Sequence, residues 1–129
     1  MVKEELKRVK KAWGWELWVV NSEYCGKLLF VDKGASSSRH AHMYKKETFF
    51  CLYGAATLTV GQEQYDLNPF ARPKTILPGQ VHSFTAQEDT LIMEVSWHHS
   101  EIDVFRESMS TPGPNPRTWS QCWPLRTVV

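Results

Sequence analysis

Short runs of aromatic and β-branched residues, separated by turn residues, recur along most of this chain of 129 residues. These side chains suit a pleated, half-buried surface, so the runs favour strands over helices. We expect strands at 15–20, 25–31, 37–44, 48–53, 56–60, 62–67, 75–77, 81–86 and 90–97. Many short strands without a long helical periodicity predict an all-β fold, either a sandwich or a closed barrel.

Composition and charge exclude several classes of protein. The net charge is +1, so the chain has no global field that would recruit nucleic acid or an anionic membrane. No apolar run is long enough to span a bilayer, and the N-terminus lacks the apolar segment of a signal peptide. The three cysteines are an odd number without a close pairing motif, which argues against a disulfide scaffold. We therefore expect buried, reduced cysteines and a cytoplasmic location.

The two ends of the chain differ from its strand-rich middle. Residues 1–12 form a charged segment in which glutamates alternate with lysines at helical spacing, and this predicts a surface helix or an irregular segment. Residues 13–105 are expected to form the barrel. Residues 106–129 form an extension with four of the seven prolines and little periodicity. We expect this extension to pack along the barrel or onto a partner subunit.

The stretch 34–54 carries residues that suggest a metal site. Five of them stand at set distances: Gly34, His40, His42, Glu47 and Gly54. Alternate side chains of a strand share a face, so the imidazoles of His40 and His42 can reach one ion about 2 Å away. A solvated turn at Lys45 and Lys46 would return the chain antiparallel and bring Glu47 over the two histidines. The glycines would permit the tight turns.

A fourth candidate ligand is His82, which begins a strand after the turn at Pro78 and Gly79. Three histidines and one carboxylate suit Mn, Fe, Co, Ni or Zn, whereas Mg and Ca prefer sites richer in oxygen. The remaining histidines, His98 and His99, follow a strand end and are expected at the surface. The sequence thus predicts a divalent transition-metal site.

This pattern resembles the first motif of the cupin superfamily, which consists of small double-stranded β-helix barrels. That motif is Gly-x5-His-x-His-x(3,4)-Glu-x6-Gly, and the chain matches it at every fixed position from Gly34 to Gly54. The resemblance implies a cupin jelly-roll barrel whose metal ligands are His40, His42, Glu47 and His82.

The second cupin motif, Gly-x5-Pro-x-Gly-x2-His-x3-Asn, is matched only in part. Gly79 and His82 are in place, whereas Ala71, Leu77 and Ala86 stand at the other three positions. The departures put the assignment of His82 in doubt more than the fold.

Looser likenesses lie within the superfamily. The segments 13–18 and 25–30 resemble the opening of small sugar-isomerase-type cupins. Glu94, Asp103 and Arg106 are similar to the end of mannose-6-phosphate isomerase-like and lyxose isomerase-like cupin domains. This likeness implies a metal-dependent aldose–ketose isomerase that acts on a small sugar or sugar phosphate.

Two residues are candidates for catalysis in such an enzyme. A metal would polarise the substrate carbonyl, so that a carboxylate base could move a proton between C1 and C2. Glu94 is the candidate base, although the alternating apolar residues between 91 and 97 place the core on the opposite face of its strand. Tyr44 has the same parity as His40 and His42 and is a candidate hydrogen-bond donor in the pocket.

Other functions remain open at this point. The same ligands serve an iron-dependent dioxygenase, and a sugar- or effector-binding cupin needs no catalysis at all. No glycine-rich phosphate loop is present, and Arg39, Arg72 and Arg106 are scattered along the sequence, so a free sugar is as plausible as a phosphorylated one. Six tryptophans, several of them near the termini, could supply an apolar outer face, and we expect a homodimer.

Overall fold

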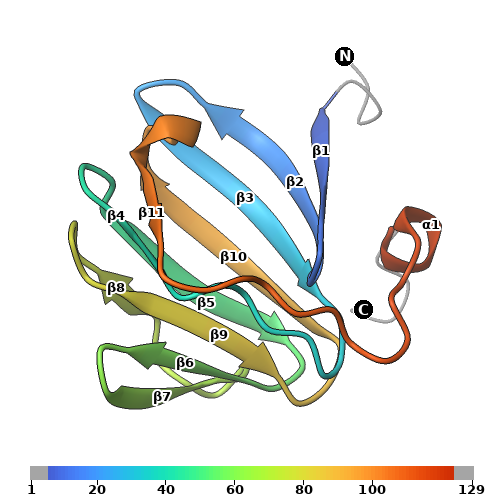
Figure 1. Cartoon of the computed structure of the whole chain (residues 1–129). Helices are drawn as coiled ribbons and strands as arrows, with labels where there is room; N and C mark the ends of the chain where they lie inside the picture. The colour runs from blue at the N-terminus through green and yellow to red at the C-terminus, as the bar shows by residue number, and fades with distance from the viewer. Residues whose placement is uncertain (1–5, 124–129) are drawn as a thin grey trace.

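The computed structural model describes residues 6–123, which form two antiparallel sheets that face each other (Figure 1). The six-stranded sheet contains, in spatial order, β1 (Lys7–Lys11), β2 (Gly14–Asn21), β3 (Tyr24–Val31), β10 (Thr90–Trp97), β5 (Glu47–Tyr53) and β8 (Lys74–Ile76). The five-stranded sheet contains β11 (Val104–Arg106), β4 (His40–His42), β9 (His82–Ala86), β6 (Ala56–Val60) and β7 (Glu63–Leu67). The prediction of an all-β jelly-roll barrel is confirmed.

Every strand expected from the sequence is present, although the run at 37–44 is reduced to β4. The helix expected near the N-terminus is wrong for the part that the structure describes. Residues 7–11 form β1 and pair with β2 from Lys7↔Trp18 to Lys11↔Gly14. Charge pairs along an isolated helix contribute only about 0.2–0.5 kcal/mol each. Pairing with the edge of β2 stabilises the segment more, because β2 supplies backbone hydrogen bonds and two indole rings. The Lys7 ammonium lies 4.1 Å from the centre of one ring and the Lys10 ammonium 5.5 Å from the centre of the other.

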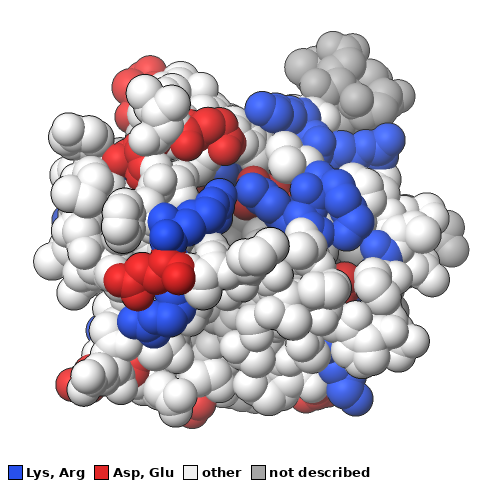
Figure 2. All heavy atoms as spheres, viewed as in Figure 1, with Lys and Arg blue, Asp and Glu red and all other residues white. Residues whose placement is uncertain are grey.

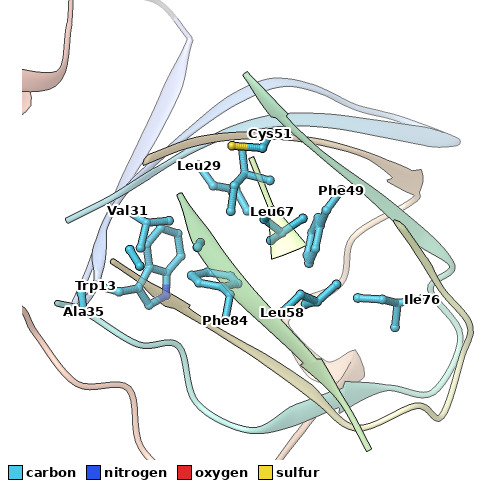
Figure 3. Packing of buried hydrophobic residues seen from close by; sticks show 13 residues of the cluster. Trp13, Leu29, Val31, Ala35, Phe49, Cys51, Leu58, Leu67, Ile76 and Phe84 are labelled. Carbon is cyan, nitrogen blue, oxygen red and sulfur yellow. The ribbon is translucent and has the colours of Figure 1, made fainter. Parts of the chain in front are cut away.

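The main core fills the space between the two sheets (Figure 3). Trp13 meets Phe84 edge to face with ring centroids 5.2 Å apart, and Phe49 lies beside them. The cluster also contains Leu29, Val31, Ala35, Cys51, Ala56, Leu58, Leu67, Ile76, Ala86 and Ile92. Phe70 lies outside this core and is 97% exposed, because it lies in the loop after β7, where its N–H donates to Asn68 Oδ1.

The C-terminal extension packs along the barrel, on the outer face of the six-stranded sheet. The short helix α1 (Trp119–Cys122) places Trp119 5.6 Å from the ring of Phe30 and buries Cys122 beside Leu17 and Leu91. Just before it, Arg117 Nε donates to Asp32 Oδ1 at 2.8 Å. The expectation of packing along the barrel is therefore confirmed up to residue 123, and residues 124–129 lie outside the described part.

The three cysteines are free and buried, as expected. Among residues 6–123, no helix is long and apolar enough to cross a membrane. The motif glycines also have the conformation that the sequence predicts. Gly34 and Gly54 have φ angles of 81° and 93°. A Cβ at Gly54 would lie 2.4 Å from the carbonyl oxygen of Asp89, so that a side chain there would have no room.

Candidate metal centre

Three histidines of the five-stranded sheet converge inside one end of the barrel. His40 on β4 stands directly opposite His82 on β9, and His42 is two residues further along the same face of β4. One ligand atom of each histidine lies within 4.8 Å of those of the other two. The three side chains can therefore hold one metal ion, as the sequence predicts.

Backbone carbonyls orient two of the three imidazoles. His40 Nδ1 lies 2.8 Å from the carbonyl oxygen of Ser38, and His82 Nδ1 lies 2.9 Å from that of Gln80. A carbonyl oxygen only accepts, so each Nδ1 carries the proton. The lone pair is then on Nε2, and this atom is free to bind a metal.

Glu47 reaches the histidines from the opposite sheet. Its Oε2 lies 3.0 Å from His82 Nε2 and 3.5 Å from His42 Nε2. The expected antiparallel return beside β4 is wrong, because β4 and β5 belong to different sheets and the chain crosses the barrel between them. The carboxylate therefore faces the histidines across the interior, and a bound ion would link the two sheets.

Unsatisfied buried atoms indicate that this donor set fits a cation. Among the described residues, His42 Nδ1, Glu47 Oε2 and His82 Nε2 are buried without a hydrogen-bond partner. Leaving such atoms unpaired costs about 1–3 kcal/mol each. Two of these atoms, Glu47 Oε2 and His82 Nε2, face each other with lone pairs on both sides. A divalent ion of Mn, Fe, Co, Ni or Zn would satisfy them.

The buried charges around the pocket have the sign that a cation would complement. The buried charged side chains of the lining are three carboxyl groups, on Glu16, Glu47 and Glu94, and two ammonium groups, on Lys27 and Lys45, whereas Lys11 and Arg106, which also line the pocket, are more exposed. All five side chains are buried. Their formal charges leave one negative charge uncompensated, and buried charge is costly unless it is paired.

Two of the three histidines, His40 and His42, are held in the neutral form that binds metal. Burial, followed by the charge of His82, lowers the pKa of His40 to about 4. Burial, followed by the charge of Lys45, lowers the pKa of His42 to about 2. A metal ion competes with protons for the same lone pairs, so neutral imidazoles are ready to coordinate at neutral pH.

Glu94 points into the pocket and lines it together with the histidines. It is 3% exposed, and its cross-strand neighbours are Lys27 on β3 and Phe49 on β5. The face of β10 that looked like core from the sequence is the outer one, where Val95 and Trp97 are about half exposed. The C-terminal extension covers the start of that outer face, around Leu91. This cover explains why the outer face of β10 carries apolar residues.

A buried lysine holds Glu94 in its ionised form. Lys45 Nζ donates to Glu94 Oε2 at 3.0 Å, and Ser96 Oγ donates to the same oxygen at 2.8 Å. Burial alone would raise the pKa of Glu94, but Lys45 and Lys27 outweigh it and lower the pKa. The carboxylate is therefore available to accept a proton.

Lys45 and His99 were expected in solvent, and both expectations are wrong. Lys45 is 2% exposed and lies between Glu94, Glu47 and His99, whose Nδ1 is 3.0 Å from Nζ. His99 is also buried, and its backbone N–H donates to Asn21 Oδ1. A signal for Lys45 was available, because it lies two positions before Glu47 and alternate residues of an extended chain share a face.

Lys27 and Glu16 also line the pocket although the sequence analysis did not single them out. Lys27 Nζ lies 3.5 Å from Glu16 Oε1 and 4.1 Å from the centre of the Trp18 ring. A lysine on the same face as Leu29 and Val31 in an apolar strand was the signal that could have revealed it.

The structure does not bring Tyr44 to the histidines. Its side chain is 81% exposed and lines a separate surface hollow with Trp97 and Ile102. Strand β4 ends at His42, so the alternation of faces does not extend to residue 44. The N–H of Tyr44 donates instead to Asp103 Oδ1 at 3.0 Å.

The sequence matches no protein-family model and no curated protein, but solved structures share its fold. CapF from Staphylococcus aureus, a capsular polysaccharide assembling protein, has a TM-score of 0.71 at 13% identity over 81% of this chain and 32% of its own. Oxalate decarboxylase from Bacillus subtilis has a TM-score of 0.69 at 17% identity over 83% of this chain and 31% of its own. Streptomyces Pac13, a nucleoside dehydratase, has a TM-score of 0.71 at 14% identity over 84% of this chain and 88% of its own.

The chain spans about a third of the length of CapF and oxalate decarboxylase, and most of the length of Pac13. Identities this low bear on the fold and not on the reaction. Together with the two facing sheets and the three converging histidines, they show that the chain has the cupin fold, a jelly-roll barrel with a group of histidines that could hold a metal.

Proposed function

We propose that this chain is a metal-dependent isomerase that interconverts the aldose and ketose forms of a small sugar or sugar phosphate. One observation carries the proposal. The buried Glu94–Lys45 pair lines the same small pocket, of about 60 Å³, as the histidines and Glu47. A base beside a metal is the arrangement that proton transfer next to a carbonyl requires.

Four side chains would hold the metal: His40, His42, His82 and Glu47. When bound, the ion supplies the positive charge that polarises the substrate carbonyl and so acidifies the neighbouring C–H group. Lys45 keeps Glu94 ionised and fixes its position. The apolar side chains of Trp13, Leu29 and Phe84, which also line the pocket, exclude water from the reacting carbons.

The two oxygens of Glu94 have different roles in this proposal. Oε2 accepts the hydrogen bonds from Lys45 and Ser96. Among the described residues, none donates to Oε1, so this oxygen is the base. It takes the proton from C2, the carbon beside the carbonyl, and delivers it to C1, while the hydroxyl proton moves in the same direction, from O2 to O1.

The direct test is an assay of metal-loaded protein with pentoses, hexoses and their phosphates for aldose–ketose conversion. Loss of deuterium from C2 of a labelled aldose would report the proton transfer itself. We expect Glu94→Gln to abolish both conversion and label loss while metal content stays at the wild-type level. Glu63→Gln, on the exposed side of β7, is the matched control and should react like the wild type.

Several outcomes would contradict the proposal. Turnover that survives in Glu94→Gln would remove Glu94 from the mechanism. Oxygen uptake by the iron-loaded protein, without sugar conversion, would favour the dioxygenase reading. Binding of sugars by a fully metal-loaded protein without any turnover would identify a binding protein.

A second candidate function is elimination of water from a sugar or nucleoside. The same base would remove the proton, and the Lys45 ammonium is an acid beside it. The likeness in fold to Pac13, a nucleoside dehydratase, makes this reaction worth including in the assay. An unsaturated product instead of a ketose would identify it.

We also expect a homodimer in the cytoplasm. The free cysteines suit a reducing compartment. Exposed apolar side chains gather where Trp97 pairs with Tyr24 across β10 and β3, and Trp97, Tyr44 and Ile102 line one hollow. Light scattering of the wild type and of Ile102→Glu would test this, because a dimer through this face should dissociate in the variant.

A further inference from the structure

A second hollow, of about 360 Å³, lies beside the metal pocket and continues it toward solvent. The two share five lining residues: Lys11, Trp13, Ser38, Arg106 and Ser110. The metal pocket alone is too small for a sugar, whereas small-molecule sites commonly measure about 300–1,000 Å³. A substrate that reaches the metal must therefore leave its far end in this second hollow.

The lining of this hollow is basic. Its cationic side chains are those of Lys10, Lys11 and Arg106, and no carboxylate lines it among the residues that the structure describes. We call it the basic hollow. Figure 2 shows Lys and Arg side chains gathered around a depression on the face that carries β1 and β11. The scatter of the arginines along the sequence is therefore no argument against phosphate recognition, because β1 and β11 bring cations together from opposite ends of the chain.

The three cations have no anionic partner of their own. In the region 6–123, none of them forms an ion pair. Two acidic residues near these cations have closer ionic partners. Glu101 pairs with His99, and Glu107 pairs with Arg39. Lys10 Nζ lies over the Trp15 ring and donates to the carbonyl of Lys11, so the charge that is free to meet a ligand is that of Lys11 and Arg106.

Three serine hydroxyls add donors to the basic hollow. Ser108 Oγ accepts the N–H of Arg39 at 2.8 Å, and Ser110 Oγ accepts the N–H of Ser38 at 2.9 Å. The third, Ser38 Oγ, accepts from Arg106 Nη1 at 3.1 Å. Each oxygen already accepts a hydrogen bond, so its own proton is left to donate.

The segment that carries these serines is fixed in place. The N–H of Glu107 donates to the carbonyl of Arg39 at 2.7 Å, and Ser36 and Thr111 exchange backbone hydrogen bonds of 2.9 and 2.8 Å. Arg106 itself stands opposite His40 in the register of β11 and β4. The donors are thus held at a set position relative to the metal ligands and need little reorganisation on binding.

We propose that the basic hollow binds the phosphate of a phosphate-monoester substrate while the carbonyl end of that substrate reaches the metal pocket. This inference rests on the proposed isomerase function and names its substrate class as sugar phosphates. A phosphate dianion presents three acceptor oxygens, and the two cations of Lys11 and Arg106 with three hydroxyl donors match it better than they match the two oxygens of a carboxylate.

The test is the affinity of the metal-loaded full chain for inorganic phosphate, measured by titration calorimetry. We expect Arg106→Gln and Lys11→Gln each to weaken it by about tenfold or more, because each removes a charge-assisted hydrogen bond. The two variants lie on edge strands of different sheets, so that one remains informative if the other fails to fold. Arg72→Gln, at an exposed position outside both hollows, removes the same charge and should change the affinity less than twofold.

A second arm compares a hexose 6-phosphate, the parent hexose and a hexuronate. The phosphate should bind tightest, and its advantage should disappear in Arg106→Gln. A hexuronate that binds as tightly as the hexose 6-phosphate would mean that the basic hollow recognises a carboxylate equally well, and this would overturn the proposal. Phosphate binding that is lost on chelation but unaffected by Arg106→Gln would mean that phosphate merely ligates the metal, and an equal effect of Arg72→Gln would mean that only net charge matters.

The two proposals fail separately. If phosphate binds as expected but no sugar is converted, the basic hollow stands and the isomerase does not. If free sugars are converted but phosphate does not bind, the isomerase stands and the basic hollow does not.

Discussion

Lys45 Nζ lies 3.0 Å from Glu94 Oε2, and both side chains are almost wholly shielded from solvent. The same ammonium lies 3.5 Å from Glu47 Oε1, so one lysine compensates two carboxylates, one assigned to the metal and one to catalysis. This shared cation links the carboxylate proposed as the base to the carboxylate proposed as a metal ligand.

Removing this lysine should destabilise the fold. Lys45→Met leaves two buried carboxylates without their cation, and breaking a buried pair in this way costs about 3–5 kcal/mol. Urea unfolding of the metal-free protein would measure the loss. Lys46→Met is the matched control. Lys46 is the next residue in the chain and its side chain is exposed, so this substitution should change the free energy of unfolding by less than about 0.5 kcal/mol. The double variant Lys45→Met/Glu94→Gln should recover part of the loss, and a single variant as stable as the wild type would disprove the role of Lys45.

Metal binding should depend on the facing histidines of β4 and β9. We expect His40→Ala and His82→Ala to lose most bound Mn, Fe or Zn, measured as metal per chain after dialysis. In the wild type, metal at a hundredfold excess over its dissociation constant should stabilise the fold by about 2.7 kcal/mol, and chelation should reverse this. His98→Ala is the control, because His98 is exposed and lies outside the pocket. Wild-type metal content in both pocket variants would refute the assigned ligands.

The position of these ligands was largely predictable from the sequence, because it depends on spacing alone. His40 and His42 share a face of a strand by alternation, and the fixed distance to Glu47 implied the metal. The runs of aromatic and β-branched residues also predicted the strands. These signals are local, so one sequence is enough to read them.

The remaining features depend on contacts that local pattern does not encode. Residues 7–11 form strand β1 because they pair with the free edge of β2. The charged sequence of this segment does not show that such an edge is available. The burial of Lys45 depends on Glu94, 49 residues away. The inner face of β10 was misjudged because the extension covers apolar residues on the outer face, and only the tertiary structure reveals that cover.

Acid should destabilise the metal-free protein before the carboxylates titrate. Burial, followed by Lys45 and Lys27, lowers the pKa of His99 to about 4, and His40 has a similar value. In the unfolded chain both would titrate near 6.5. Between these values the unfolded state holds more protons than the folded state, so stability is complete above about pH 6.5 and falls as the pH decreases toward 4.

His42, whose pKa is lowered further, to about 2, adds to the loss, so that each of the three histidines can contribute about 3 kcal/mol between pH 6.5 and 4, from 1.36 kcal/mol per pKa unit. Chelator-treated protein unfolded in urea at a series of pH values would measure it. His99→Gln, which keeps a polar side chain without a titrating group, should flatten the profile by roughly a third, whereas the exposed His98→Gln should leave it unchanged. A wild-type profile that is flat between pH 6.5 and 4 would contradict the expected burial of neutral imidazoles.

Anchoring of the C-terminal extension should depend mainly on the ion pair of Arg117 with Asp32, because Asp89 Oδ1 lies farther from Arg117 Nε, at 3.7 Å. Arg117 donates to Asp32 Oδ1 through Nε at 2.8 Å and to the carbonyl of Val31 through Nη2 at 3.2 Å, and Asp32 is fully buried. Arg117→Ala would leave that carboxylate without a cation, so we expect a loss of about 3 kcal/mol and faster cleavage by trypsin after the other basic residues near the end of the chain.

Replacing both partners, in Arg117→Ala/Asp32→Asn, should cost less than the single change, because no buried charge is then left unpaired. Lys33→Ala serves as the control, since its side chain is exposed beside Asp32. If Arg117→Ala unfolds at the wild-type urea concentration and resists trypsin equally, α1 and its indole contacts alone hold the extension.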